Sequence, residues 1–339
     1  MCNHEVMTEQ LLLDEQGEIR EPGWSRKMYQ QYRRKMIKAP SFRIKEWDYY
    51  LVTGKDFACA FTISDNGYVG LQSVSLLIFD DMPREHTETV LNVMPMGKLH
   101  MPETSAAGNT VYTDQRLQMT YTVGKNTRKI RCHFENFMNG KPLNAEIELE
   151  QPEMDSLVIA TPWDKKHAFY FNQKINCMPA SGYVEFDGVR REFDPQTDFG
   201  TLDWGRGVWT YDNTWYWSSG NARINGKAFG FNLGYGFGNT TAATENVIHY
   251  DGKAHKLDDI TFSIPANYTD PWKVTSSDGR FEADFVPVLD RAAKLDFKVI
   301  VSDQHQVFGR MSGKAVLDDG EVITFNDLLC FAEEVHNKY

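Results

Sequence analysis

One stretch of the chain, residues 198–217, concentrates the side chains that could do chemistry. It reads DFGTLDWGRGVWTYDNTWYW and holds Asp203 and Arg206 together with four of the eight tryptophans. Burial of a carboxyl group against an indole ring raises its pKa, which would make Asp203 a general acid. The structural alternative is that Asp203 pairs with Arg206, which stands between two glycines, and ties down a corner between strands. Both interpretations stay open.

A second carboxylate, Glu245, follows a strand-like segment and precedes an expected hairpin strand that carries His249. Asp203 and Glu245 could form the acid–base pair of a glycosidase, which requires two carboxylates at a defined separation. A structural or surface role for Glu245 is the alternative. We therefore take Asp203, Glu245 and Arg206 as candidate catalytic residues. The candidate ligand contacts are the aromatic and polar side chains nearby: Trp204, Trp209, Trp215, Trp217, Asn232, Tyr235 and His249.

Motifs for metals, nucleotides and nucleophilic serine are missing from the sequence. It contains no HExxH, CxxC or EF-hand loop, no GxGxxG or GxxxxGK[ST], and no GxSxG. His249 and His255 flank an expected hairpin, where histidines usually stay solvated. We therefore expect no metal site and no cofactor.

Composition excludes several partners. The 339 residues include 36 basic and 47 acidic side chains, a net charge of −11, so the field that attracts nucleic acid is absent. No apolar run reaches the roughly 18 residues of a membrane-spanning helix, and residues 1–10 lack the apolar core of a signal peptide. The five cysteines are odd in number and form no CxxC pair, which favours reduced, mostly buried thiols. We expect a cytoplasmic protein that binds a small molecule, with an oligomeric state that the sequence does not define.

Turn chemistry gives the strongest structural signal. Asn-Gly or Asp-Gly pairs occur at 66–67, 139–140, 187–188, 225–226, 251–252, 278–279 and 319–320. Such pairs favour the positive φ angles of type I′ hairpins. Because most of them lie between strand-like runs, they predict mainly antiparallel β-structure.

Residues 229–238, FGFNLGYGFG, alternate large and small side chains. In a strand this pattern puts the large residues on one face and the small ones on the other. The small face either lets another backbone approach closely or leaves space for a ligand in a barrel.

Helix is expected in only two places. In residues 24–38, Trp24, Met28, Tyr32 and Met36 repeat every four positions, which predicts a helix with a basic outer face that packs on a barrel or binds a membrane surface. A second short helix is expected at 326–337. We divide the chain into an N-terminal arm (1–40), a first β-barrel (41–155) and a second β-barrel (156–339), with the junction in the turn-rich residues near 151–153 and 161–163.

Several segments resemble one bacterial family of unknown function, number 2804. They are KEWDYY at 45–50, LDWGRGVW at 202–209, NLGYG at 232–236, TEN at 244–246, FGRMSG at 308–313 and DDGE at 318–321. The match covers nearly the whole chain. More distantly, the layout is similar to tandem lipocalin-like proteins, a group that includes carotenoid 1,2-hydratases and Diels–Alderase-like proteins. This resemblance implies an all-β fold of two consecutive lipocalin-like (calycin) antiparallel β-barrels, here with a short N-terminal helical arm, and a ligand cavity.

The distant relatives also imply a mechanism. An acid protonates a double bond, aromatic faces stabilise the cation, and water or an internal nucleophile traps it. In this chain the acid would be Asp203, and the aromatic wall would be Trp204, Trp209, Trp215, Trp217 and Tyr235. The leading hypothesis is thus a cofactor-independent hydratase, cyclase or isomerase acting on a small, largely apolar ligand. The alternatives are a non-catalytic hydrophobic ligand-binding protein and a glycosidase.

Overall fold

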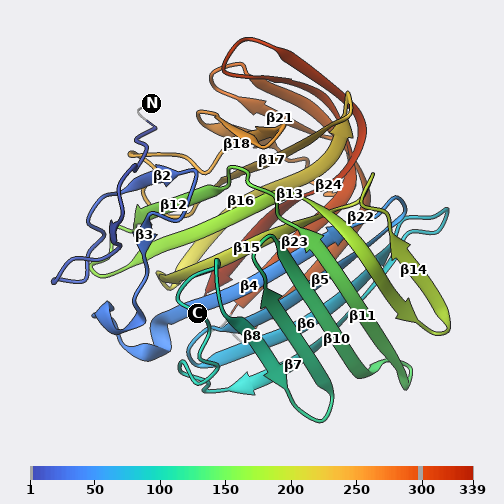
Figure 1. The fold of residues 1–339 in the computed structure, drawn as a ribbon, viewed down its shortest axis with the longest axis horizontal. Helices are drawn as coiled ribbons and strands as arrows, with labels where there is room; N and C mark the ends of the chain where they lie inside the picture. Colours follow the sequence, from blue (N-terminus) through green and yellow to red (C-terminus); the bar gives the residue numbers. More distant parts are fainter. Residues whose placement is uncertain (1–2, 297–300, 339) are drawn as a thin grey trace.

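The computed structural model describes residues 3–296 and 301–338. Within these ranges the chain forms 24 strands and two short 3-10 helices. Nearly all strands belong to two large antiparallel sheets, and one small parallel pair joins β1 (Gln10–Leu11) to β3 (Gln30–Gln31). Figure 1 shows both large sheets strongly curled, the first in blue to yellow-green and the second in yellow to red. The prediction of an all-β protein with two consecutive antiparallel β-barrels is confirmed, each barrel taking the form of a curled half-barrel sheet.

The first sheet has thirteen strands, and its main path runs β7-β6-β5-β4-β15-β13-β11-β10-β9-β8. The long strand β13 also pairs with β12 and β14, and β12 pairs with β2. The bounds are β2 (Gly23–Ser25), β4 (Ile44–Thr53), β5 (Phe57–Asp65), β6 (Val69–Ile78), β7 (Arg84–Val93), β8 (Asn109–Thr113), β9 (Leu117–Val123), β10 (Thr127–Met138), β11 (Lys141–Glu150), β12 (Leu157–Pro162), β13 (Phe169–Phe186), β14 (Val189–Phe193) and β15 (Phe199–Val208).

The second sheet has nine strands in the order β19-β18-β17-β16-β24-β23-β22-β21-β20. Its bounds are β16 (Asp212–Ile224), β17 (Lys227–Tyr235), β18 (Val247–Tyr250), β19 (Lys253–Lys256), β20 (Ile260–Ser263), β21 (Trp272–Ser276), β22 (Phe281–Asp296), β23 (Val301–Val316) and β24 (Val322–Lys338). The chain passes from the first sheet to the second between Val208 and Asp212. The division into domains at residue 155 stays a prediction, but β12, β13 and β15 lie in the first sheet.

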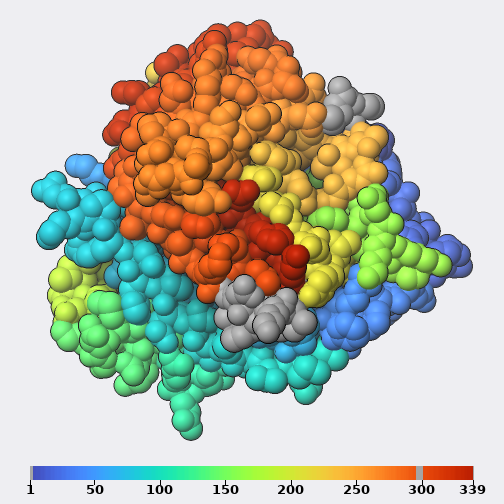
Figure 2. All heavy atoms as spheres, turned by 180° about the vertical axis from the view of Figure 1, so that it is seen from behind, coloured from blue at the N-terminus to red at the C-terminus, as the bar shows by residue number. Residues whose placement is uncertain are grey.

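Strand alternation produces three apolar cores. On β4, Tyr50 and Val52 face the concave core of the first sheet, whereas Tyr49 and Leu51 face the second sheet. Phe231 of β17 packs in the concave core of the second sheet. The third core lies between the sheets, and Figure 2 shows the orange and red residues of the second sheet lying against the cyan residues of the first. The sheets are therefore joined through an extensive buried interface.

The predicted turns are confirmed: all seven Asn-Gly and Asp-Gly pairs connect consecutive strands. Both residues have positive φ at 139–140, 187–188, 225–226 and 251–252, as a type I′ turn requires. At Gly67, Gly279 and Gly320 only the glycine has positive φ. The four cysteines in the described part of the chain are buried free thiols, and Cys2 lies outside the described residues.

Both predicted helices are wrong. Residues 24–38 contain β2, β3 and the 3-10 helix η1 (Arg34–Met36), followed by η2 (Ser41–Arg43). Trp24 pairs with Ile159 of β12, and the Tyr32 hydroxyl donates to Glu46 at 2.8 Å, so tertiary contacts hold this arm extended. Residues 326–337 belong to β24, which pairs with β16 and β23 inside the second sheet. In both places strand pairing and burial outweigh local periodicity.

Candidate functional site

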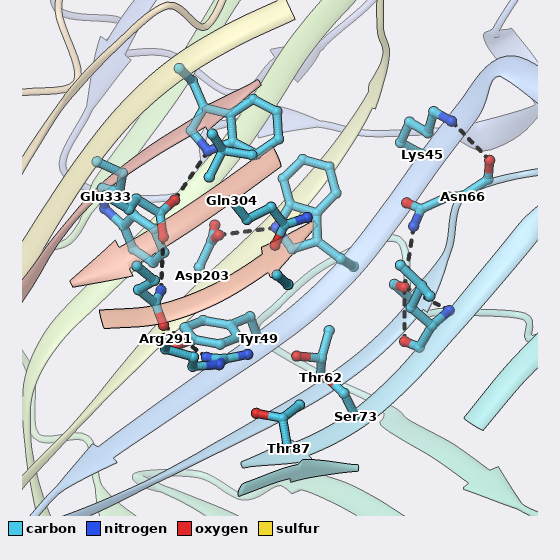
Figure 3. A pocket seen from close by; sticks show the side chains of 18 of the residues that line it. Lys45, Tyr49, Thr62, Asn66, Ser73, Thr87, Asp203, Arg291, Gln304 and Glu333 are labelled. Carbon is cyan, nitrogen blue, oxygen red and sulfur yellow. Dashed lines mark hydrogen bonds between the residues drawn. The ribbon is translucent and has the colours of Figure 1, made fainter. Parts of the chain in front are cut away.

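A cavity of about 320 Å³ lies between the two sheets. It differs from the expected cavity inside a barrel, because its walls are the sides of the sheets that face each other. The first sheet contributes residues of β4–β7, β13 and β15, and the second contributes residues of β16 and β22–β24. Figure 3 shows carboxylates and aromatic rings on one side of this cavity, and the hydroxyls of Thr62, Ser73 and Thr87 on another. The volume suits a small molecule.

Asp203 lines this cavity, as predicted, but its partners differ from the prediction. In the β13–β15 register it stands directly opposite Lys174, whose Nζ lies 2.9 Å from Oδ1. Asn172 Nδ2 donates to Oδ1 at 2.6 Å, and Trp47 Nε1 donates to Oδ2 at 3.1 Å. An ammonium and two N–H donors stabilise negative charge on this carboxylate. All three contacts are made by donors, so the carboxyl oxygens of Asp203 act here as hydrogen-bond acceptors.

Gly205 explains how the Trp47 indole reaches Asp203. Gly205 of β15 and Trp47 of β4 are cross-strand partners. A Cβ on Gly205 would lie only 2.0 Å from Cζ2 of Trp47, so the glycine leaves room for the ring to lie over β15. The same ring stacks on Tyr170 at a centroid distance of 6.4 Å. The glycine thus positions a donor of the Asp203 site.

Arg206 and Trp204 point away from Asp203, so the structural alternative in which Asp203 pairs with Arg206 is wrong. Successive strand residues alternate faces, and three positions along β15 place the two side chains on opposite faces. Arg206 is fully buried in the first sheet, where Nη1 contacts Asp48 Oδ1 at 3.0 Å and its guanidinium lies 4.1 Å from the Trp204 ring. Since it also donates to backbone carbonyls of Trp47 and Pro102, its contacts are structural.

Glu333 of β24 is a cavity carboxyl that the sequence analysis missed. Trp215 Nε1 donates to its Oε1 at 3.1 Å, and Gln306 Nε2 donates to its Oε2 at 2.8 Å. Burial raises its pKa from 4.5 to about 7. The hydrogen bonds from Gln306 and Trp215 and the charge of Lys174 oppose this rise, and nearby Asp203 adds to it. Glu333 is therefore partly protonated at neutral pH. The sequence analysis missed Glu333 because residues 326–337 were interpreted as a helix and because the hydrogen-bond donors to Glu333 lie in strands far away in the sequence.

The glycosidase hypothesis requires Glu245 and Asp203 to share one cavity. Glu245 does not line the cavity that Asp203 lines. It is buried behind Tyr170, whose hydroxyl lies 3.1 Å from Oε2. Burial raises its pKa to about 7. A Cβ on Gly234 would lie 2.2 Å from Glu245 Oε1, so the small face of β17 makes room for this carboxyl. Close approach, rather than ligand space, explains the alternating residues 229–235.

The other candidate ligand contacts divide into two groups. Trp209, Trp215 and Trp217 line the cavity together with Trp47, Tyr49, Tyr170 and Phe237. Asn232 lies behind them, where it accepts a hydrogen bond from Trp217 Nε1 at 2.7 Å. Tyr235 stacks on Tyr216 at 4.4 Å beside the core of the second sheet. His249 was expected to contact the ligand or to stay solvated on a hairpin, but it is buried away from the cavity. This burial lowers its pKa to about 4.

In the described part of the chain, no group of three or more His, Cys, Asp or Glu side chains is arranged to hold a metal ion. None of the described helices is long and apolar enough to cross a membrane.

Fold and site together define a two-sheet antiparallel β-protein with a carboxyl-lined cavity between its sheets. The sequence matches the family described as Domain of unknown function (DUF2804) over residues 3–339, and the chain belongs to this family. The resemblance found in the sequence is therefore confirmed. A search of proteins with curated descriptions finds no match for the chain.

Two solved structures are similar in overall arrangement. Kievitone hydratase from Nectria haematococca has 11% sequence identity and a TM-score of 0.47, over 87% of this chain and 88% of that one. A candidate AttH protein from Nitrosomonas europaea has 12% identity and a TM-score of 0.49, over 89% of this chain and 94% of that one.

Proposed function

We propose that this protein is an enzyme that acts on a small, largely apolar molecule between its two sheets by acid–base chemistry of the hydratase, cyclase or isomerase type. One observation carries the proposal: two carboxyl groups with opposite environments line the same cavity. Asp203 contacts an ammonium group, whereas Glu333 is buried against neutral donors. Two carboxyl groups in unlike surroundings within one cavity are typical of acid–base sites.

Glu333 is the proposed general acid, in place of Asp203. With a pKa of about 7, it is partly protonated at neutral pH and can still lose its proton. Hydrogen bonds from Trp215 and Gln306 fix the plane of the carboxyl group. The proton would pass to one carbon of a ligand double bond, whose π electrons form the new C–H bond. The neighbouring carbon is then left with a positive charge.

The surroundings of Glu333 suit a cationic intermediate. The rings of Trp209, Trp215 and Tyr170 supply π faces worth about 0.5–2 kcal/mol each, and the Asp203 carboxylate offsets the charge of Lys174 in the same wall. The Lys174 ammonium already lies 3.9 Å from the centre of the Trp217 ring, which is a cation–π contact within the same wall. Water or a group of the ligand itself would add to the cation, and its proton would return to the Glu333 carboxylate.

The test uses Glu333→Gln, with Glu334→Gln as the matched control. Glu334 is the next residue of β24, on the opposite face, where it accepts hydrogen bonds from Tyr216 and Tyr268. Arylalkenes, isoprenoid alkenes and cyclic ethers are incubated in D₂O with each protein, and mass spectrometry follows hydration, isomerisation and deuterium uptake. Binding is followed through tryptophan fluorescence.

We expect Glu333→Gln to lose turnover by about a hundredfold or more while its ligand affinity changes little, because the amide cannot deliver the proton. Glu334→Gln should keep both. Undiminished turnover in Glu333→Gln contradicts the proposed acid. Binding without turnover in the unaltered protein supports the alternative of a non-catalytic ligand-binding protein.

A further inference from the structure

Tyr49 presents an unsatisfied donor to the cavity. It lies on β4, is 8% exposed, and packs its ring edge-on against Trp217 at a centroid distance of 5.9 Å. Its hydroxyl has no partner in hydrogen-bond geometry among the described residues. Arg291 and Gln306 both act on Tyr49, but neither lies in hydrogen-bond geometry to its hydroxyl. Burial raises the pKa of Tyr49 to about 12, so the hydroxyl stays protonated.

Arg291 faces the same part of the cavity because of a β-bulge. Phe281 and Phe285 of β22 pack into the concave core of the second sheet. The register of β22 shifts between Pro287 and Leu289, and the odd-numbered residues beyond the shift face the space between the sheets. Leu289 accordingly packs in the inter-sheet core, and Arg291 lines the cavity. The bulge therefore aims a cation into the cavity.

Among the described residues, Gln306 accepts a hydrogen bond from Arg291, and Tyr49 also interacts with the guanidinium. Nη1 donates to Gln306 Oε1 at 2.8 Å, whereas a guanidinium carries five N–H donors. No carboxylate forms an ion pair with Arg291 in the part of the chain that the structure describes. Lys174, by contrast, is paired with Asp203. Figure 3 shows Arg291 beside Tyr49 at one end of the cavity.

We propose that Arg291 and Tyr49 bind the carboxylate of the ligand. The ligand of the cavity is then an otherwise apolar carboxylic acid, bound in its ionised form. The planar guanidinium matches a carboxylate in a two-point contact, and the tyrosine hydroxyl adds a neutral donor. The apolar body of the ligand packs against Trp215 and Trp217. This inference rests on the proposed function for the reaction, but the binding of the anion can be measured by itself.

The register of the second sheet connects this anion site to the proposed acid. Arg291 stands opposite Gln306, Gln306 stands opposite Glu333, and Glu333 stands opposite Trp217. The side chain of Gln306 bridges the pair, since its Oε1 accepts from Arg291 and its Nε2 donates to Glu333. A carboxylate held at Arg291 therefore places the adjoining carbons of the ligand near Glu333. A further carboxylate of the described lining, Glu85 of β7, lies on the opposite sheet and accepts a hydrogen bond from Thr87.

The experiment compares acids with their uncharged amides of the same shape. The probes are trans-cinnamate and cinnamamide, 4-phenylbutyrate and 4-phenylbutyramide, and decanoate and decanamide, with affinities measured by calorimetry at neutral pH. The variants are Arg291→Gln and Tyr49→Phe. The control is Arg310→Gln, which alters an arginine of β23 that lies outside this cavity and contacts Asp327 instead. Circular dichroism verifies that each variant is folded.

We expect the unaltered protein to bind at least one acid about tenfold or more tightly than its amide, as a charge-assisted contact predicts. Arg291→Gln should abolish this preference and leave amide binding unchanged, Tyr49→Phe should reduce it several-fold, and Arg310→Gln should preserve it. Equal affinity for acid and amide, failure of every acid to bind, or a preference that survives Arg291→Gln overturns the inference. A preference for acids without turnover would refute the proposed reaction but support the anion site. Turnover of neutral ligands alone would support the proposed reaction but refute the anion site.

Discussion

Replacement of Lys174 by methionine tests whether the Asp203 site depends on its buried ion pair. The side chains of Lys174 and Asp203 are 2% and 11% exposed, and their charged atoms lie 2.9 Å apart. At an effective dielectric constant of about 20, such charges attract each other by about 6 kcal/mol. Desolvation offsets part of this, and removal of one partner from a buried pair typically costs about 3–5 kcal/mol. Because Asn172 and Trp47 still donate to Asp203, we expect a loss of about 3 kcal/mol.

Urea denaturation, followed by tryptophan fluorescence, measures this loss. The control Lys141→Met removes a pair with Asp187 in which both side chains are about half exposed, and it should cost less than about 1 kcal/mol. In the double variant Lys174→Met/Asp203→Asn, no charge is left unpaired, so its loss should be smaller than the sum of the single losses by about 2 kcal/mol. If Lys174→Met costs no more than Lys141→Met, or if the single losses simply add, the pair does not hold the site together.

Two further predictions concern the same cavity. The pKa of Glu333 is raised from 4.5 to about 7, so the stability gained from its proton is complete below pH 4.5 and is lost as the pH rises to 7. Relative to Glu333→Gln, the unaltered protein should lose about 3 kcal/mol of unfolding free energy between pH 4.5 and 8. Urea denaturation of both proteins at several pH values measures this difference. If the unfolding free energies of the two proteins change in parallel with pH, the pKa of Glu333 is not raised. Gly205→Ala would place a Cβ 2.0 Å from the Trp47 ring and should cost about 1–3 kcal/mol, with altered tryptophan fluorescence from the displaced indole. An unchanged melting temperature and spectrum would show that Trp47 does not need this glycine.

Local chemistry in the sequence predicted the fold well because hairpin turns are local. An Asn-Gly or Asp-Gly pair carries its own preference for positive φ, and that preference needs no information from distant residues. The two predicted helices failed for the opposite reason. The stripe that includes Trp24 and Tyr32 has helical spacing, but its residues reach β12 and Glu46 through tertiary contacts. Local periodicity does not contain those partners.

The position of Asp203 in the cavity was predictable in part. Once β15 is recognised as a strand, the three-residue separation from Arg206 already requires opposite faces, so pairing of the two could have been rejected. Its actual partner, Lys174, is contributed by another strand, and only the β13–β15 register brings the two together. A bulge between Ile175 and Met178 follows directly after this pair, so counting residues back from the turn would give the wrong register.

The general acid could not be found from its sequence neighbours, because what distinguishes Glu333 from Glu334 is the face of β24 on which each lies. The two glutamates are adjacent, yet only one faces the first sheet and loses contact with water. Its donors, Trp215 and Gln306, belong to the strands on either side, more than a hundred positions and 27 positions away in the chain. A raised carboxyl pKa is thus a property of the packed sheets. The tryptophan-rich segment indicated the right cavity and the wrong carboxyl, since aromatic density predicts where water is excluded but not which acid is enclosed there.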